Sequence, residues 1–255
     1  RPKTLGEIAR LIKDENLPEN LRQIILENPR KLEESALNYF KKFLKYEQKW
    51  QNKILNILNN SLEPFRNPNV DFATAKSDFD IANFSQNLAT LYIAINPQDL
   101  GIGEQLLNFL YNHFIDRLIS CSQKIDYSQN RGVNFYLDEF YNLGKMQEIA
   151  SKIPYLRGYK IKFILFATDF ERLDSKYDRN LVNSIVNDCY YKIFYTPKNL
   201  YNISRILENL PITNNWAEKL KELPNDSQII VKDFIDPLIS KKFYYYNDQS
   251  MKGRI

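Results

Sequence analysis

The sequence has few of the residues from which metal centres and nucleophilic triads are built. Its 255 residues include one histidine, His113, and two cysteines, Cys121 and Cys189, which lie far apart and form no CxxC pair. Zinc sites and Ser-His-Asp triads need several such side chains close together. Both classes of site are therefore excluded, and we interpret the cysteines as buried thiols in a reducing compartment.

Glycine is also scarce, with seven residues in the chain. None belongs to a GxxxxGK[ST] phosphate loop or a GxGxxG fingerprint, and the pair Gly101 and Gly103 has no Lys-Ser/Thr after it. This chain therefore cannot hold a triphosphate in the usual P-loop manner. If it works with a nucleotide, we expect the phosphate loop to precede Arg1, which is not a start residue and indicates a piece of a longer protein.

Long hydrophobic runs are missing as well. No stretch reaches the roughly 18 uninterrupted apolar residues of a membrane span, and the first residues show no signal peptide. With 44% hydrophobic and 26% charged residues the composition is that of an ordinary globular protein. The net charge of +4 permits contact with nucleic acid or acidic lipid but argues for neither.

The first 66 residues contain no convincing strand. Thr4 and Glu7 have capping-box spacing at the start of a first helix, and Pro18 starts a second. Pro29 suits the first turn of a long third helix, because apolar residues recur at helical spacing to about Leu62. We therefore predict an all-α domain over residues 1–66. This domain is either a bundle that binds a partner or DNA, or a plain helical insertion. We interpret its lysines as a helix face exposed to solvent.

After Asn67-Pro68-Asn69 the pattern changes to alternating strands and helices, which predicts an α/β domain over residues 67–255. Helical patterns at 103–124, 143–156 and 173–187 separate the first four expected strands. Strands spaced in this way imply right-handed crossovers and a parallel sheet, with the last two strands as an edge addition. The expected strands cover residues 88–95, 133–138, 161–168, 190–196, 228–233 and 241–246.

The stretch VNFYLDEF, residues 133–140, carries the most specific chemistry. An apolar run ends in Asp138 and Glu139, and in open α/β sheets ligands bind beyond the carboxyl ends of the strands. Asp138 is placed to hold Mg²⁺ on a triphosphate, and Glu139 to orient or deprotonate the attacking water. The alternative is a solvated strand end without a ligand.

At this point the sequence resembles a known family. FYLDEFYNLGKMQEIASKIPYLRGYKIKFILFATDFERLDSKY resembles the Walker B region of the type IV secretion coupling proteins, the TraG-like and TraD-like hexameric ATPases. SDFD with LATLYIAINPQDL, YYKIFYTPKN, LPNDSQIIV and KKFYYYND resemble flanking strands of that family. The resemblance covers about residues 70–255, and LDEF-x-x-LG is its most specific part.

The resemblance implies a RecA-like parallel sheet with flanking helices, of which residues 67–255 form the C-terminal part. It implies ATP and Mg²⁺ as cofactors, with Asp138 holding Mg²⁺ directly or through water and Glu139 as the catalytic carboxylate. Arg157 would act on the nucleotide of a neighbouring subunit, or else be a surface arginine. Thr168 stands where the family has a longer, Gln-like γ-phosphate sensor, so either Asp169 assists it or sensing is altered.

The function expected from the resemblance is that of a motor fragment that recruits protein or nucleoprotein substrates and drives them into a secretion channel. The parent would be a hexamer with a membrane anchor before this chain, placing the fragment in the cytoplasm of a bacterium at its inner membrane. Partners would be a secretion substrate or an adaptor or chaperone protein, and DNA. Without its phosphate loop the fragment would be inactive. The alternative is a non-catalytic docking module that binds an effector or adaptor through the helical domain.

Overall fold

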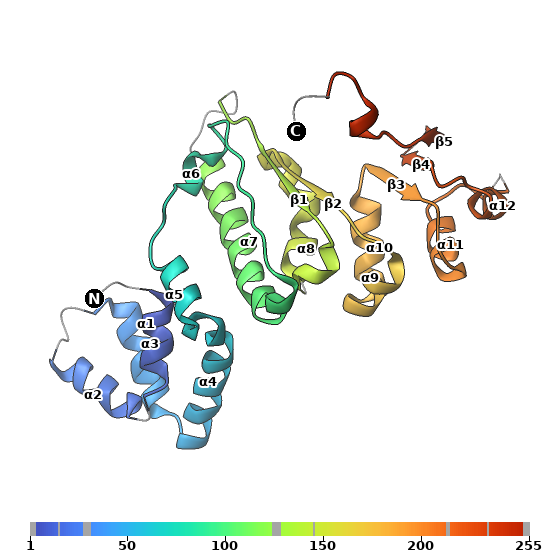
Figure 1. Ribbon diagram of the computed structural model, residues 1–255. Coiled ribbons are helices and arrows are strands. Elements are labelled where there is room, and N and C mark those ends of the chain that lie inside the picture. The colour runs from blue at the N-terminus through green and yellow to red at the C-terminus, as the bar shows by residue number, and fades with distance from the viewer. Residues whose placement is uncertain are drawn as a thin grey trace. The chain divides into compact units, whose positions relative to one another are not determined.

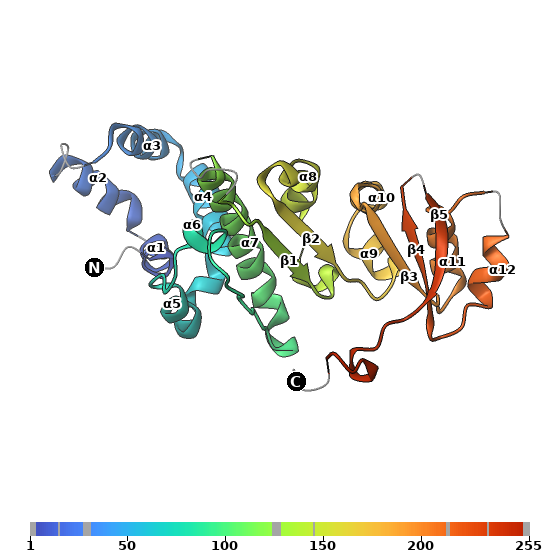
Figure 2. The same ribbon diagram turned by 90° about the horizontal axis from the view of Figure 1, so that it is seen from above.

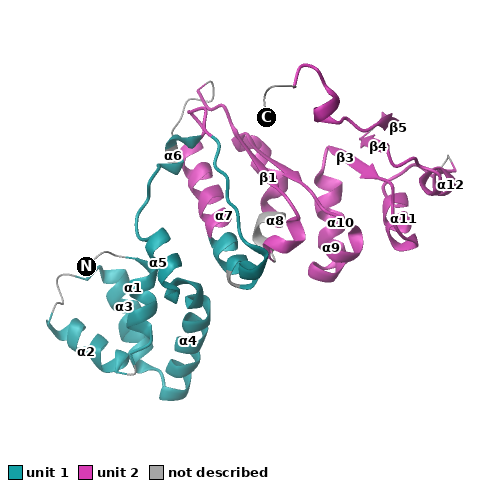
Figure 3. Cartoon of the chain, in the orientation of Figure 1, with its two compact units in different colours: residues 1–84, 90–109 teal, residues 85–89, 110–255 magenta. Residues whose placement is uncertain are grey.

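The computed structural model describes residues 4–14, 16–27, 32–123, 129–144, 146–212, 215–233 and 235–251. The chain forms two compact units (Figure 3). Residues 1–84 and 90–109 make the first, and residues 85–89 and 110–255 make the second. The predicted domain boundary after residue 66 stays a prediction.

The first unit is helical in its described residues. Its elements are α1 (Leu5–Ile12), α2 (Leu17–Glu27), α3 (Glu34–Lys45), α4 (Gln48–Ser61), the 3₁₀ turn η1 (Glu63–Arg66), α5 (Pro68–Thr74), α6 (Ile81–Phe84), η2 (Pro97–Asp99) and the start of α7 (Leu100–Ser122). The predicted cap is confirmed, since the backbone N–H of Glu7 donates to the hydroxyl of Thr4 over 3.1 Å. Asn67 caps α5 in the same way, with Pro68 at its first position.

One aspartate fastens α1 to α5. Asp71 accepts a hydrogen bond of 2.6 Å from Arg10 and one of 3.4 Å from the hydroxyl of Thr4. Gly6 makes room for it, because a Cβ added there would lie 1.9 Å from an Asp71 carboxylate oxygen. A side chain at position 6 would therefore displace the group that holds the two helices together.

The long third helix predicted from Pro29 onward is wrong where it can be tested. The chain forms two helices, α3 and α4, because Tyr46 and Glu47 are extended; Pro29 itself lies outside the described residues. Gln51 explains the break. Its buried amide donates to the carbonyls of Phe43, Leu44 and Tyr46, and so satisfies groups that the end of α3 leaves without a helical partner. Apolar periodicity runs through this break unchanged and could not reveal it.

The second unit contains the strands. Figures 1 and 2 show the strands from β1 to β5 with helices between and beside them. Its elements, after the rest of α7, are β1 (Val133–Leu137), η3 (Phe140–Leu143), α8 (Gln147–Leu156), η4 (Arg157–Tyr159), β2 (Ile161–Leu165), α9 (Phe170–Lys176), α10 (Arg179–Asp188), β3 (Tyr191–Tyr195), α11 (Leu200–Leu207), α12 (Trp216–Lys221), β4 (Ser227–Lys232), β5 (Ile235–Lys241) and η5 (Tyr245–Asn247).

The strands form a parallel pair and an antiparallel group. β1 and β2 are parallel, with Val133 opposite Ile161 and Leu137 opposite Leu165. Gly132 allows the two backbones to approach closely where the pair begins. It has φ +82°, and a Cβ there would lie 2.5 Å from the carbonyl oxygen of Lys160. β4 pairs antiparallel with β3 on one side and β5 on the other. The fold is thus an α/β fold with a parallel sheet and flanking helices, as predicted. The strand predicted at 190–196 as part of the parallel sheet is β3, which pairs antiparallel with β4 instead.

Two predicted strands are wrong. Residues 88–95 belong to no strand, and Leu88 and Tyr92 are almost fully exposed, so an apolar run without a hydrogen-bonding neighbour does not become a strand. The strand predicted at 241–246 is β5, which ends at Lys241 and is followed by the turn η5. β5 lies at the edge of the antiparallel group, the position in a sheet at which a proline such as Pro237 is tolerated.

The helix predicted over 173–187 is interrupted. It is two helices, α9 and α10, joined at Tyr177 and Asp178. Both residues have extended backbones, and the Asp178 carboxylate caps α10 by accepting from the N–H of Asn180 over 2.6 Å.

Candidate active site

The carboxylates predicted from the sequence lie directly after β1. Asp138 and Glu139 form the turn between β1 and η3, and Thr168 follows β2 before α9 begins. Because β1 and β2 are parallel, their carboxyl ends meet at one edge of the sheet. The two segments are tied there, since the N–H of Phe140 donates to the carbonyl of Phe166 over 2.9 Å. The parallel pairing thus brings Glu139 and Thr168 together.

Glu139 has an uncommon backbone conformation. Its φ of 47° and ψ of 51° lie in the left-handed region, one of two such non-glycine residues in the described chain. Its own N–H donates to the Asp138 carboxylate over 3.1 Å. Non-glycine residues in this region are enriched at functional sites, where the surrounding structure maintains the strain.

A chain of polar side chains ends on Glu139. The hydroxyl of Thr168 donates toward both carboxylate oxygens of Glu139, at 2.7 and 3.0 Å. The hydroxyl of Tyr141 lies 3.2 Å from that of Thr168, and Arg172 donates to Tyr141 over 2.9 Å. An arginine can only donate and a carboxylate can only accept. The hydrogen bonds therefore run in one direction, from Arg172 through Tyr141 and Thr168 to Glu139.

These neighbours stabilise the ionised form of Glu139. The hydroxyl of Tyr141 lowers the pKa of Glu139 most, followed by the hydroxyl of Thr168. Burial opposes them, and the positive charge of Arg172 makes a smaller contribution in the same direction as the hydroxyls. Tyr141 in turn raises the pKa of the Arg172 guanidinium. Glu139 is therefore negatively charged at neutral pH and already bound to a hydroxyl donor.

Asp138 is exposed, with its carboxylate available to solvent at the edge of the sheet. No group of three or more His, Cys, Asp or Glu side chains that could hold a metal occurs among the described residues. A lone exposed carboxylate fits Mg²⁺, which keeps several waters and takes one or two carboxylates together with substrate phosphates. It does not fit a metal that needs a site made only of protein ligands.

Arg157 lies apart from this cluster. It is exposed at the end of α8, where the chain turns through η4, and no contact with Asp138, Glu139 or Thr168 is found within the described residues. An arginine in this place can contact another molecule. It does not complete the site within its own chain.

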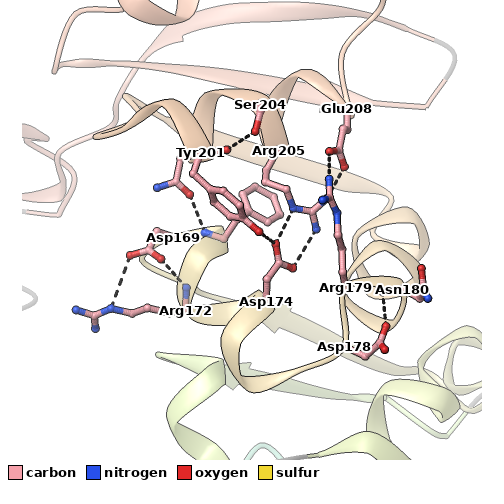
Figure 4. A network of polar contacts seen from close by, with 12 residues as sticks. Asp169, Arg172, Asp174, Asp178, Arg179, Asn180, Tyr201, Ser204, Arg205 and Glu208 are labelled. Atoms are coloured by element: carbon pink, nitrogen blue, oxygen red, sulfur yellow. Dashed lines mark hydrogen bonds and ion pairs between the residues drawn. The ribbon is translucent and has the colours of Figure 1, made fainter.

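The helix that carries Arg172 is held firmly from behind (Figure 4). Asp169 caps α9, accepting from the N–H of Arg172 over 2.8 Å. On the far side of the helix, Asp174 binds the buried Arg205 of α11 through hydrogen bonds of 2.8 and 3.2 Å. The buried amide of Asn202, also from α11, accepts from the N–H of Phe170 over 2.9 Å. These contacts fix α9 against α11.

Tyr141 and Arg172 were not predicted as site residues. Tyr141 is the fourth residue of the block Asp138-Glu139-Phe140-Tyr141, and Arg172 is four residues beyond Thr168. The sequence offered one signal for them, since a hydroxyl and a cation follow closely after the two predicted strand ends. Their partnership could not be read from the sequence, because it depends on the η3 turn placing Tyr141 beneath α9.

Within the described part of the chain, none of the helices combines the length and apolar character needed to cross a membrane. This agrees with the absence of long hydrophobic runs in the sequence.

Comparison with known proteins places the chain in a family. Residues 8–209 match the model of the family "Type IV secretory system Conjugative DNA transfer". Protein VirD4 of Rhizobium rhizogenes is 24% identical over 218 residues, which cover 75% of this chain and 32% of VirD4. Conjugal transfer protein TraG of Escherichia coli is 28% identical over 156 residues, covering 56% of this chain and 24% of TraG. The chain thus spans about a third of the length of the VirD4 proteins.

The fold is similar to that of solved coupling proteins. The bacterial conjugative coupling protein TrwBdeltaN70 has a TM-score of 0.59 at 11% identity, covering 94% of this chain and 68% of that one. The plasmid coupling protein TrwB in complex with the non-hydrolysable GTP analogue GDPNP has a TM-score of 0.60, with 93% and 62% covered. Since the family model matches more than half of its residues, this chain belongs to the type IV secretion coupling proteins of conjugative DNA transfer.

Proposed function

We propose that this chain is the Walker B part of the motor of a coupling ATPase that moves protein or nucleoprotein substrates into a type IV secretion channel. The observation that carries the proposal is the pairing of Glu139 with Thr168 at the carboxyl ends of β1 and β2, next to the exposed Asp138. A related protein, TrwB, binds a nucleotide analogue, which supports a nucleotide as the ligand. The phosphate loop would be contributed by a part of the protein outside this chain.

In this proposal each residue has a distinct role. Asp138 holds Mg²⁺ directly or through water, and Mg²⁺ supplies charge neutralisation on the phosphates of ATP when bound. Glu139 accepts a hydrogen bond from the attacking water and orients it toward the phosphoryl group. Thr168, bonded to Glu139, is placed to respond to the γ-phosphate. These roles need both carboxylates ionised, and the low pKa of Glu139 satisfies that need at neutral pH.

Arg157 is proposed to act on the nucleotide of a neighbouring subunit in a hexamer. Its exposed position at the end of α8, without a contact to the carboxylates of its own chain, supports a role across a subunit boundary. A guanidinium there would stabilise negative charge on the transferring phosphoryl group. In the assembled protein the motor would lie on the cytoplasmic side of the bacterial inner membrane, with DNA, a secretion substrate or an adaptor as partners.

ATP turnover by the longer protein containing this chain tests the assignment. We expect Glu139→Gln to lower kcat by about a hundredfold or more, because the variant keeps the size of the side chain but loses its charge. Glu222→Gln, which removes an exposed carboxylate at the end of α12, is the matched control. Normal turnover by Glu139→Gln would refute the catalytic role.

A second function is favoured by the surface of the helical unit. Leu26 and Phe72 are 80% and 81% exposed, and Tyr39 is 74% exposed. Large apolar side chains that are exposed in this way are candidates for contacts with a partner. In this alternative the helices bind an adaptor or effector and the sheet is a scaffold.

The two functions respond to different variants of the longer protein. Capture of secretion substrates or adaptors should be lost in Leu26→Ser and Tyr39→Ser if the helices dock a partner, while ATP turnover persists. If the same variants retain every partner, the docking function is wrong.

A further inference from the structure

We propose that Tyr141 and Arg172 are positioning residues, which hold the Thr168 hydroxyl, and through it the Glu139 carboxylate, in one orientation. The proposal deepens the proposed function and rests on it for the meaning of that orientation. It concerns two side chains that the resemblance to the family does not assign.

The first argument is the direction of the hydrogen bonds. The hydroxyl of Thr168 has a single proton, and it points at Glu139 only if no other acceptor competes. Since that proton is directed at Glu139, the 3.2 Å contact between the two hydroxyls requires Tyr141 as the donor to Thr168. The oxygen of Tyr141 in turn accepts from Arg172, which favours this orientation of the tyrosine hydroxyl. Without these two residues, the bond to Glu139 would be the one restraint left on the Thr168 hydroxyl within the described residues.

The second argument is the rigidity of Tyr141. Its side chain is 6% exposed in η3, and the guanidinium of Arg172 lies 5.5 Å from the centre of its ring. A buried tyrosine hydroxyl needs hydrogen-bond partners, and both of those found here belong to the path between Arg172 and Glu139. A ring held in this way keeps its hydroxyl at a fixed point, which a short Thr168 side chain alone could not secure.

The third argument is the placement of Arg172. Its side chain is 60% exposed, and its other partner, the Asp169 carboxylate, is 3.7 Å away, so the ion pair alone contributes little. Figure 4 shows its guanidinium extending away from Asp174 and the buried network on the other side of α9. The arginine therefore does little for the packing of its helix. Within the described residues, its guanidinium makes one close hydrogen bond, to the hydroxyl of Tyr141.

A purely structural role for Tyr141 predicts a different result. If the ring only packs under α9, Tyr141→Phe preserves the function, since it keeps the ring and removes one oxygen. If the hydroxyl positions Thr168, the same variant frees the Thr168 side chain to change rotamer without unfolding the chain.

The first experiment measures the side-chain rotamer of Thr168 by NMR in this chain, from the three-bond couplings of its methyl carbon to the backbone, with Thr168→Val identifying its resonances. We expect the wild type to show the couplings of one staggered rotamer, and Tyr141→Phe and Arg172→Gln to show values averaged over several, because each variant removes a group that holds the hydroxyl. The matched controls are Tyr155→Phe and Arg117→Gln, whose side chains are exposed on α8 and α7. Unchanged couplings in Tyr141→Phe would overturn the proposal.

The second experiment measures ATP turnover of the longer protein. Tyr141→Phe and Arg172→Gln should lower kcat by about tenfold with little change in KM, because they disturb the orientation of Glu139 and not the binding of the nucleotide. If Glu139→Gln is fully active, the proposed function fails, while the NMR measurement on Thr168 still decides the positioning role. If Glu139→Gln is inactive and Tyr141→Phe matches the wild type in both experiments, the positioning role alone fails.

Discussion

Helix α9 has an arginine network on each side, and the two differ in exposure. Arg205 is 1% exposed and binds Asp174, which is 9% exposed, together with Glu208. Arg172 is 60% exposed and binds the hydroxyl of Tyr141. The guanidinium of Arg205 is therefore removed from water, whereas that of Arg172 is hydrated.

The difference in exposure predicts that one arginine matters for the stability of the fold and the other for the chemistry of the candidate site. A buried ion pair is costly to break, because removing one partner leaves the other charge without water or a counter-ion. An exposed arginine can be replaced with little loss of stability, and its effect is felt by the groups to which it is bonded. We therefore expect the Arg205 side of α9 to control folding of the second unit, and the Arg172 side to control Glu139.

The largest effect is expected for Arg205→Ala. Among the described residues it leaves the buried Asp174 with the hydroxyl of Tyr201 as its remaining side-chain partner, and it should lower the free energy of unfolding by about 3–5 kcal/mol. Urea unfolding followed by the fluorescence of the buried Trp216, in a Trp50→Phe background, reports on the second unit alone. A loss below 1 kcal/mol would show that the buried pair does not hold α9.

A smaller loss is expected for Asn202→Ala. The N–H of Phe170 then loses its acceptor at the buried start of α9, at a cost of about 1–3 kcal/mol. Hydrogen exchange at the Phe170 amide should accelerate more than exchange in α12. Equal protection of that amide in the variant and the wild type would contradict this role.

Arg179→Gln should have an effect of about 0–1 kcal/mol, although Arg179 binds the same Glu208 as Arg205. Its side chain is 57% exposed, so water replaces the lost partner. Comparison with Arg205→Ala in the same unfolding experiment isolates burial as the cause. If the two variants lose similar amounts of unfolding free energy, burial does not explain the difference between the two arginines.

The smallest effect on stability, and the one that depends most on pH, is expected for Thr168→Val. Because the folded state lowers the pKa of Glu139, the stabilisation is present above the unfolded pKa and is lost as the pH falls through the folded pKa. The wild type should thus be slightly more stable than Thr168→Val at neutral pH and equal to it in acid. Thr168→Ser, which keeps a hydroxyl, is the control, and a difference independent of pH would contradict the linkage.

Local features of the fold were predictable where a few neighbouring residues decide them. The cap at Thr4, the strand β1 just before Asp138 and most of the helix α7, predicted over 103–124, follow from capping chemistry and periodicity. The break between α3 and α4 was not predictable, since it depends on where the amide of Gln51 folds back. The run at 88–95 failed as a strand for a similar reason, because strands need a partner that sequence pattern does not supply.

The sequence by itself determined which chemistry is available. The lack of a His and Cys cluster, the pair Asp138 and Glu139 and the missing phosphate loop limited the candidates to a carboxylate site that needs a partner segment. Only the tertiary structure decided how Glu139 is held. Thr168, Tyr141 and Arg172 reach it because parallel pairing of β1 and β2 aligns two strand ends, and hydrogen bonds form only between groups that the fold has brought within about 3 Å.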